Sequence, residues 1–192
     1  GANGRMTVDD VILAREAIAG AAVLLLQLEV PLPVVRAAAQ LARARGVTVV
    51  LNAAPAQAVD DELLALADYL VVNETEVFAL AGSGVHDRGG AIAALQARGT
   101  RHVVLTLGAA GAILAPHGGD WTSVYAFTVP VVDTTAAGDA FVGAFAVALA
   151  DGAAPEEALR RGNGAGALTV TRAGAQPSLP TRADLDTWLR ER

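Results

Sequence analysis

The sequence contains no lysine and no cysteine, and all 14 of its basic residues are arginines. A chain without lysine has no Walker A loop, which needs a lysine on the phosphates, and forms no Schiff base with pyridoxal phosphate. A chain without cysteine has no disulfide framework and no cysteine-based zinc site. The three histidines, His86, His102 and His117, are far apart without ligand spacing, so we expect surface or loop positions for them.

Basic charge and long apolar runs are also scarce. The formal net charge is -6, which argues against a nucleic-acid or membrane-surface role because such roles need a basic face. No apolar stretch has membrane-spanning length, and no basic segment precedes an apolar one as in a signal peptide. With 192 residues, 53% hydrophobic and 18% charged, the chain is long enough for one domain with a sizeable core. These features fit a cytoplasmic protein.

The pattern of apolar residues alternates between strand and helix. Continuous apolar runs predict buried parallel strands at 21–29, 47–52, 68–73 and 101–108. Helical spacing predicts helices at 7–19, 35–46, 61–67, 74–82, 90–99, 136–150, 156–171 and 182–190, and residues 111–116 and 121–130 read as a hairpin. Thr7 and Asp10 resemble a capping box, and Gly46 ends a helix. This order predicts an α/β fold with a mostly parallel sheet covered by helices on both faces.

Polar residues collect where the predicted strands end. Glu29, Asn73, Thr106 and the segment 133–139 each follow an apolar run. In open parallel sheets, ligands bind outside the carboxyl ends of the strands, so these residues are the candidates for a site. Each has a plainer interpretation as a turn or cap, and for Asn73 alone the two weigh equally.

The stretch DTTAAGDAF at 133–141 brackets small residues with two acids. Small residues allow close approach of the backbone, and a helix follows at once. The N–H groups of Ala136, Ala137 and Gly138 would then form an anion hole for a phosphoryl group. Asp139 has two readings: an acid that stabilises the positive end of the helix dipole, or a general base that deprotonates an attacking hydroxyl. The residues alone do not separate them.

Here the sequence resembles a known family. DTTAAGDAF is similar to the second signature of the ribokinase family, the PfkB carbohydrate kinases, which mostly have DTxGAGDxF; Ala136 stands in place of the first glycine. VLLLQLEVPL, the segment LNAAPAQAVDDELLALADYLVVNETE, TLGAAG and TRAGAQPSLP resemble further motifs of that family, in the same order. LNAAPA has alanine where the family commonly has its first proline. The resemblance runs from Gly1 to the last predicted helix.

The resemblance implies an ATP-dependent kinase acting on the primary hydroxyl of D-ribose. It implies that Asp139 is the catalytic base and also contacts the sugar, as Glu29 does, beside the anion hole of residues 136–138. It places Asn73 at the nucleotide phosphates and Glu76 at Mg²⁺ through water, which suits the reluctance of Mg²⁺ to dehydrate. The other nucleotide contacts that it implies are Thr106, Leu107, Gly108, Ala109, Ala110, Gly111 and Asn163.

The resemblance also implies a K⁺ site against the anion-hole loop, held largely by carbonyl oxygens. The residues that match it are Asp133, Thr135, Thr169, Arg172, Gly174 and Ser178. Arg172 and Ser178 also have a plainer interpretation as ordinary loop residues.

One departure from the family is the start of the chain, which reads GANGRM without an initiator methionine. Members of the family begin with a sugar-binding portion and a β-lid that forms a homodimer interface. We therefore expect a fragment, with exposed apolar surface beside 21–29 and an intact protein that is a homodimer. Three hypotheses stay open: a ribokinase, a kinase of the same family for another sugar or a nucleoside, and an inactive nucleotide-binding module. A dinucleotide dehydrogenase is disfavoured, because no G-x-G-x-x-G follows the first strand.

Overall fold

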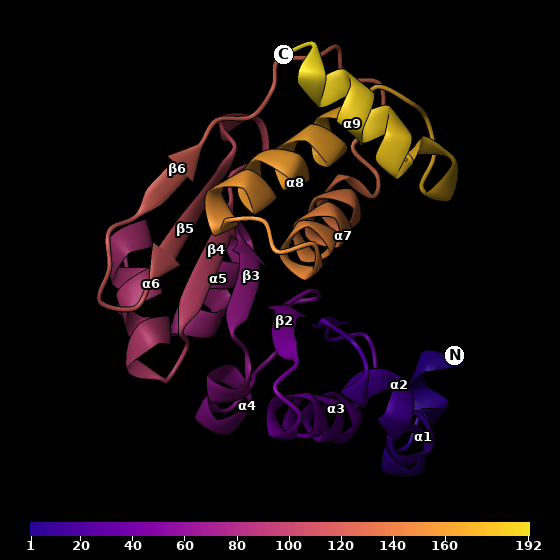
Figure 1. Ribbon diagram of the computed structural model, residues 1–192. Helices are drawn as coiled ribbons and strands as arrows, with labels where there is room; N and C mark the ends of the chain where they lie inside the picture. Colours follow the sequence, from indigo (N-terminus) through magenta and orange to yellow (C-terminus); the bar gives the residue numbers. More distant parts are fainter. The chain divides into compact units, whose positions relative to one another are not determined.

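A computed structural model describes all residues, 1–192, as two compact units (Figure 1). The first unit comprises residues 1–106 and 115–121, and the second comprises residues 107–114 and 122–192. None of the helices is long and apolar enough to cross a membrane.

The first unit alternates strands and helices. Its elements are a 3-10 turn at Asn3–Arg5, α1 (Val8–Leu13), α2 (Arg15–Ala19), β1 (Val23–Leu26), α3 (Leu32–Ala44), β2 (Thr48–Asn52), α4 (Asp61–Leu66), β3 (Tyr69–Asn73), α5 (Glu74–Ala81), α6 (Arg88–Ala97) and β4 (His102–Thr106). The four strands pair in parallel in chain order, β1 with β2, β2 with β3 and β3 with β4. The predicted parallel sheet is confirmed for these strands.

The centre of the first unit is the middle of β2, β3 and β4. Val49–Leu51, Leu70–Val72 and Val103–Leu105 are all at most 1% exposed, which explains why these strands read as continuous apolar runs. Helices α5 and α6 pack against β4 and against each other, and α3 packs against β1 and β2.

Strand β1 differs from the expectation of a buried strand at 21–29. It spans only Val23–Leu26, none of its residues is fully buried, and Leu25 is 41% exposed. The strand ends early because the chain turns at Gln27, whose side-chain carbonyl accepts a hydrogen bond from the N–H of Glu29 at 3.0 Å. The expected exposure of apolar surface along this segment is confirmed at Leu25.

The predicted helix at 7–19 is divided at Ala14 into α1 and α2, without a glycine or proline to signal the break. Its predicted start is confirmed, because the Asp10 carboxylate accepts hydrogen bonds from the N–H and the hydroxyl of Thr7. Gly46 follows the end of α3 with a φ of 72°, as its predicted role requires. His86 and His117 are exposed, as expected, and His102 is partly exposed at the start of β4.

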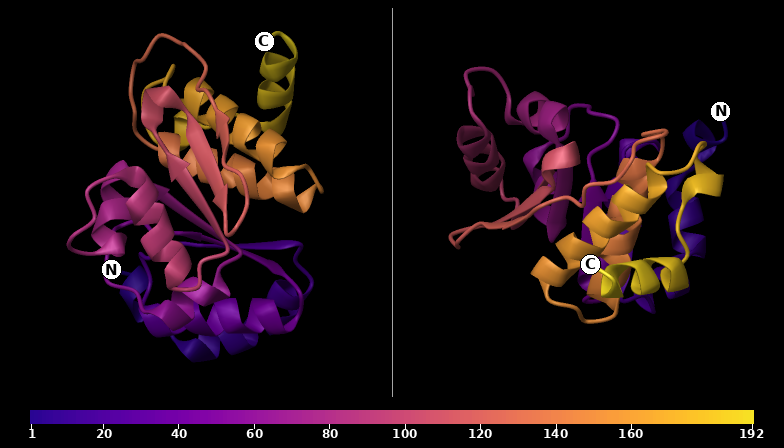
Figure 2. Two further views of the ribbon diagram at one scale, coloured as in Figure 1. Left: turned by 90° about the vertical axis from the view of Figure 1, so that its left-hand side faces the viewer. Right: turned by 90° about the horizontal axis from the view of Figure 1, so that it is seen from above.

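The second unit combines a hairpin with helices α7, α8 and α9 (Figure 2). Its elements are a 3-10 turn at Gly108–Ala110, β5 (Ala112–Pro116, whose last two residues group with the first unit), β6 (Thr122–Val124), α7 (Ala137–Ala150), α8 (Pro155–Thr169), a 3-10 turn at Gln176–Ser178 and α9 (Arg182–Arg190). The hairpin is confirmed, since β5 pairs antiparallel with β6. Its second strand is shorter than expected, because residues 125–130 form no strand.

Helix α8 lies close to α7 and α9 because it presents glycines to both. A Cβ on Gly162 would stand 2.8 Å from the ring of Phe141 on α7. A Cβ on Gly164 would stand 2.9 Å from the side chain of Leu189 on α9. These distances are below ordinary van der Waals separation, so the helices can approach this closely only where α8 has no side chain.

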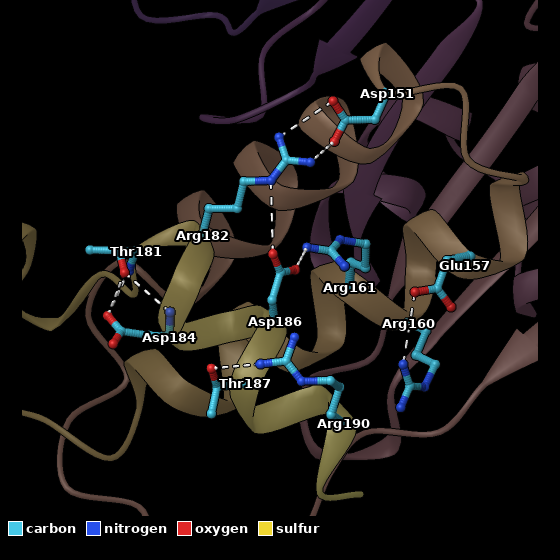
Figure 3. A network of polar contacts seen from close by, with 10 residues as sticks. All are labelled: Asp151, Glu157, Arg160, Arg161, Thr181, Arg182, Asp184, Asp186, Thr187 and Arg190. Atoms are coloured by element: carbon cyan, nitrogen blue, oxygen red, sulfur yellow. Dashed lines mark hydrogen bonds and ion pairs between the residues drawn. The ribbon is translucent and has the colours of Figure 1, made fainter.

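Ion pairs fasten α9 to the other two helices (Figure 3). The guanidinium of Arg182 contacts Asp151 at the end of α7 at 2.7 Å, and Asp186 accepts a hydrogen bond from Arg161 of α8. At the far end of α9, Trp188 packs edge-on against Phe127, with ring centroids 4.8 Å apart. The carboxyl-terminal helix is therefore part of the packed second unit.

The two helical glycines Gly162 and Gly143 make a matched test of this packing. Gly162→Ala should lower the free energy of unfolding by about 1–3 kcal/mol, because the methyl group overpacks the contact with Phe141. Gly143→Ala in α7 should raise it by up to about 1 kcal/mol, because nothing lies within 4 Å of its Cβ position and alanine favours the helix. Urea unfolding of both variants measures these free energies. Equal changes in the free energy of unfolding of the two variants would contradict the packing argument.

Candidate functional site

The carboxyl end of β3 carries Asn73 and Glu76, which cap helix α5. The Asn73 side-chain oxygen accepts hydrogen bonds from the N–H groups of Thr75 and Glu76, at 2.9 and 2.8 Å. A Glu76 carboxylate oxygen accepts from the Asn73 N–H at 2.8 Å. The capping interpretation of Asn73 is thus confirmed. It leaves the Asn73 amide NH₂ and the second Glu76 oxygen without a partner in the chain.

Glu76 is a buried carboxylate, only 8% exposed. Burial raises the pKa of Glu76 above its ordinary value, and the hydrogen bond from the Asn73 N–H lowers it in part. An oxygen with no protein donor in such a place suits a hydrated divalent cation, which would be bound through water. No group of three or more His, Cys, Asp or Glu side chains is arranged to hold a metal, so a cation here would depend on few protein ligands.

Thr106 ends β4 directly beside Asn73. The two residues are register partners in the parallel pairing of β3 with β4, and the Thr106 hydroxyl donates to the Val72 carbonyl at 3.4 Å. The structure therefore brings together two residues that the sequence separates widely.

The turn after Thr106 depends on two glycines with positive φ. Gly108 has a φ of 54° and Gly111 a φ of 102°, and the Leu107 N–H donates to the Gly111 carbonyl at 2.8 Å. A Cβ on Gly111 would lie 2.1 Å from the Val124 carbonyl oxygen, so no side chain fits there. Ala109 and Ala110 between them are exposed. The turn thus presents backbone and small side chains to solvent.

Glu29 is exposed just beyond β1. Its carboxylate accepts a hydrogen bond from the Asn3 side-chain amide at 3.3 Å, and its N–H is held by Gln27. Residue Gln27, which orients this turn, was missed in the sequence because it falls inside an apolar run.

Helix α7 begins with an exposed backbone end. Ala136 stands before the helix with a φ of 59°, the only non-glycine residue in the left-handed region. That conformation costs an alanine about 1–2 kcal/mol. The N–H groups of Ala136 and Gly138 donate to no group in the chain, while that of Ala137 makes a 3.3 Å contact with the Thr134 carbonyl. A Cβ on Gly138 would meet nothing within 4 Å, so this end is open.

Asp139 lies in the first turn of α7, exposed and without a hydrogen bond or ion pair to its carboxylate. An unpaired carboxylate beside free backbone donors is what a general base beside an anion hole needs. It is also favourably placed at the positive end of the helix, so both interpretations fit the geometry.

Asp133 joins two loops of the second unit. Its two carboxylate oxygens accept hydrogen bonds from the N–H groups of Gly174, at 2.8 Å, and Thr135, at 2.9 Å. These hydrogen bonds lower the pKa of Asp133 to about 2, and the bond from Gly174 has the largest effect. Its carboxylate is therefore ionised at any physiological pH.

Several carbonyl oxygens in the segments that Asp133 joins have no partner in the chain. Those of Asp133, Thr135, Arg172, Gly174 and Ser178 accept no hydrogen bond from the chain. The carbonyl of Thr169 differs, since it accepts from the Arg172 N–H at 3.1 Å, and the buried Thr169 hydroxyl has no partner. The Ser178 hydroxyl donates to the Ala175 carbonyl at 2.6 Å. Free carbonyl oxygens beside a carboxylate form a donor set that fits a hard cation.

Asn163 of α8 is buried and already bonded. Its amide donates to the carbonyls of Val124, at 2.9 Å, and Tyr125, at 3.3 Å. It thereby fastens the end of β6 to α8, a structural role that the sequence did not indicate.

Comparison with known proteins identifies the family of the chain. The family model described as pfkB family carbohydrate kinase matches residues 7–182. The chain belongs to the PfkB family. It is 43% identical to the ribokinase of Haemophilus influenzae over 187 residues and 42% identical to that of Staphylococcus aureus over 189 residues, covering 96% and 94% of this chain.

The solved ribokinase of Arabidopsis thaliana, complexed with ribose and ATP, superimposes on 99% of the chain with a TM-score of 0.90 at 34% identity, and 63% of that structure is covered. The predicted ribokinase-like α/β fold is confirmed. The chain spans 61% and 60% of the length of the two bacterial relatives.

In this PfkB chain, one residue near the start of α7 escaped the sequence analysis. A Cβ on Gly166 of α8 would stand 3.4 Å from the Ala137 carbonyl, so position 166 lies in van der Waals reach of the first turn of α7. The sequence did contain a signal for this packing. Glycine recurs at 162, 164 and 166 inside a predicted helix, although glycine is unfavourable in helices.

The raised pKa of Glu76 predicts a pH-dependent stability difference. A raised carboxyl pKa stabilises the fold below the unfolded-state pKa, and this contribution is lost as the pH rises through the folded-state pKa. Glu76→Gln keeps an acceptor for the Asn73 N–H and removes the buried charge. The free energy of unfolding of the variant, relative to the parent, should therefore be higher at pH 7 than at pH 4, as measured by urea titration. The exposed Glu16→Gln is the control; a difference that is flat with pH for Glu76→Gln would contradict the argument.

Proposed function

We propose that the protein phosphorylates D-ribose at its primary hydroxyl with ATP, giving D-ribose 5-phosphate. The observation that carries the proposal is the free Asp139 carboxylate next to the unpaired N–H groups of Ala136 and Gly138. The relatives named ribokinase, and the ribokinase that binds ribose and ATP, supply the choice of sugar and nucleotide.

Asp139 is the general base in this proposal. Its carboxylate takes the proton of the sugar hydroxyl as that oxygen attacks the γ-phosphorus of ATP. The bond between the γ-phosphorus and the bridging oxygen breaks, and ADP leaves. Phosphoryl transfer asks the protein mainly for positioning and charge stabilisation, and one base and one anion hole provide both.

Backbone and amide donors stabilise the phosphates. The open end of α7 receives the negative charge that grows on the transferred group, and Gly138 leaves room for that group to approach. The Asn73 side-chain NH₂, which the cap leaves unpaired, donates to a phosphate oxygen of the nucleotide. The exposed turn Thr106–Gly111 contacts the nucleotide through its backbone, and Asn163 contributes near the adenine only through its oxygen, because its donors are engaged.

Two cations complete the proposal. Mg²⁺, when bound with ATP, would offset the phosphate charge, and Glu76 would hold its hydration shell through the oxygen that the cap leaves free. K⁺ fits the carbonyl oxygens and the Asp133 carboxylate beside the loop that precedes α7. Of the six residues named for K⁺, Thr169 fits least, since its carbonyl is already bonded. In this proposal Glu29 contacts the sugar. The cytoplasmic location and the homodimeric state of the intact protein stay predictions.

Asp139→Asn tests the base. In the protein as its gene encodes it, we expect turnover to fall by about 10²–10⁴-fold while ATP affinity stays within a few-fold, since the base acts in the transition state. The control is Asp9→Asn, another exposed, unpaired acid in the first turn of a helix, which should keep full turnover. A coupled ADP assay over pentoses, hexoses and nucleosides measures both variants. Turnover of Asp139→Asn equal to the parent would remove Asp139 from its role, and a clear preference for fructose or a nucleoside would replace ribose as substrate.

Exchange of Na⁺ for K⁺ at constant ionic strength tests the monovalent cation. Activity should rise, because a cation bound by the carbonyl oxygens would order the loop before α7. Asp133→Ala should blunt the rise, while Asp9→Asn should leave it intact. Equal activity of the parent protein in the two salts would overturn the assignment of all six residues.

A further inference from the structure

A polar groove lies at the amino-terminal edge of β2, β3 and β4, at the opposite ends of the strands from Asn73 and Thr106. Its volume is about 440 Å³, within the usual range for small-ligand pockets. It lies where three helices lead into strands, and it is lined by Arg43 of α3 with Gly46 after it, by Asp68 and the first residue of β3, Tyr69, and by Arg101 and the first residue of β4, His102. Along β3, Tyr69 and Asn73 are four residues apart, which is about 13 Å of strand.

Two guanidinium groups share a single carboxylate in this groove. Nη1 of Arg43 and Nη1 of Arg101 lie 3.2 and 3.1 Å from the same oxygen of Asp68. The other Asp68 oxygen accepts from the Val49 N–H at 2.9 Å, so the carboxylate is fixed to the sheet. Neither arginine has a further partner in the chain, and each keeps most of its N–H donors free.

This arrangement is unlike the other ion pairs of the protein. Arg36 has two carboxylate partners, Arg88 and Arg98 have one each, and Arg161 and Arg182 share two. Asp186 is also shared by two arginines, but Arg182 has a second acid in Asp151, whereas Arg43 and Arg101 have only Asp68. On a chain of net charge -6, the groove is thus a local excess of positive charge.

Two aromatic side chains, which carry no charge of their own, also line the groove. The rings of Tyr69 and His102 stack with centroids 4.9 Å apart. Burial lowers the pKa of His102, the neighbouring Asp68 carboxylate raises it in part, and Arg101 lowers it further, so the imidazole is neutral at pH 7. The positive charge of the groove therefore comes from the two arginines alone.

We propose that this groove binds small anions that carry a phosphoryl group. Two arginines side by side offer the forked N–H donors that match phosphate oxygens, and a phosphate would supply the second negative charge that the pair lacks. The stacked rings and the volume leave room for an organic portion beside the phosphate. The groove is a separate binding site, and it depends neither on the proposed kinase activity nor on any residue assigned to it.

The test is a titration of the ¹⁵N-labelled protein at constant ionic strength with inorganic phosphate, D-ribose 5-phosphate and AMP, each followed by NMR. Saturable shifts should appear at Gly46, Tyr69 and His102, separately from any at residues 134–139. If the three affinities are equal, the groove recognises the phosphoryl group alone. If a phosphate ester binds more tightly, the groove also contacts its organic portion; either result supports the site.

Two variants should move the affinity in opposite directions. Arg101→Ala should weaken binding by about tenfold or more, because it removes charged hydrogen bonds. Asp68→Asn keeps an acceptor for the Val49 N–H and removes the competing charge, so it should tighten binding. The matched control is Arg15→Ala, since Arg15 and Arg101 are both 56% exposed. Shifts confined to residues 134–139, an unchanged affinity in Arg101→Ala, or weaker binding in Asp68→Asn would each overturn the proposal.

Discussion

The second unit depends on one carboxylate, that of Asp133. Its two oxygens hold the N–H groups of Thr135 and Gly174, and the Val170 carbonyl accepts from the N–H groups of Val132 and Asp133 on the same side. These contacts fix the short segment that enters α7 against the loop that follows α8. Because Ala136 must adopt a left-handed conformation there, the segment needs such external support. The direction of the free N–H groups at the start of α7 follows from this junction.

The glycines of α8 supply the second support for the same place. Gly162 and Gly164 allow α8 to lie directly against Phe141 of α7 and Leu189 of α9, and Gly166 faces the Ala137 carbonyl. Salt bridges also connect α9 to Asp151 at the end of α7 and to Arg161 of α8. The first turn of α7 is therefore held by packing along α8 and by Asp133, so a ligand would meet donors that are already oriented.

The sequence predicted those elements whose signals are local. Strands β2, β3 and β4 and most helices begin and end within a few residues of their predicted positions, because apolar runs, capping residues and glycines mark them. For β1, the apolar run alone predicts burial, whereas the family resemblance led us to expect the exposure found at Leu25, which depends on which strands pair with β1. The candidate residues at strand ends were found individually. The pairing of Asn73 with Thr106, the unpaired carbonyls near Asp133 and the bonded amide of Asn163 arise from contacts between distant segments, which no local pattern records.

The two ends of the parallel strands of the first unit carry different chemistry. At the carboxyl end of β3, a helix begins, and its N–H groups are satisfied by acceptors, so Asn73 and Glu76 gather there. At the amino ends, helices have just finished. Arg43 lies in the last turn of α3, where a cation is favoured, and Arg101 directly precedes β4. Only one acid, Asp68, lies among the cations of the groove, and it is the hydrogen bond to Val49 that retains it there. Asp68 compensates only one of the two guanidinium charges. The amino-terminal edge of these strands is therefore locally positive, unlike the rest of this acidic protein.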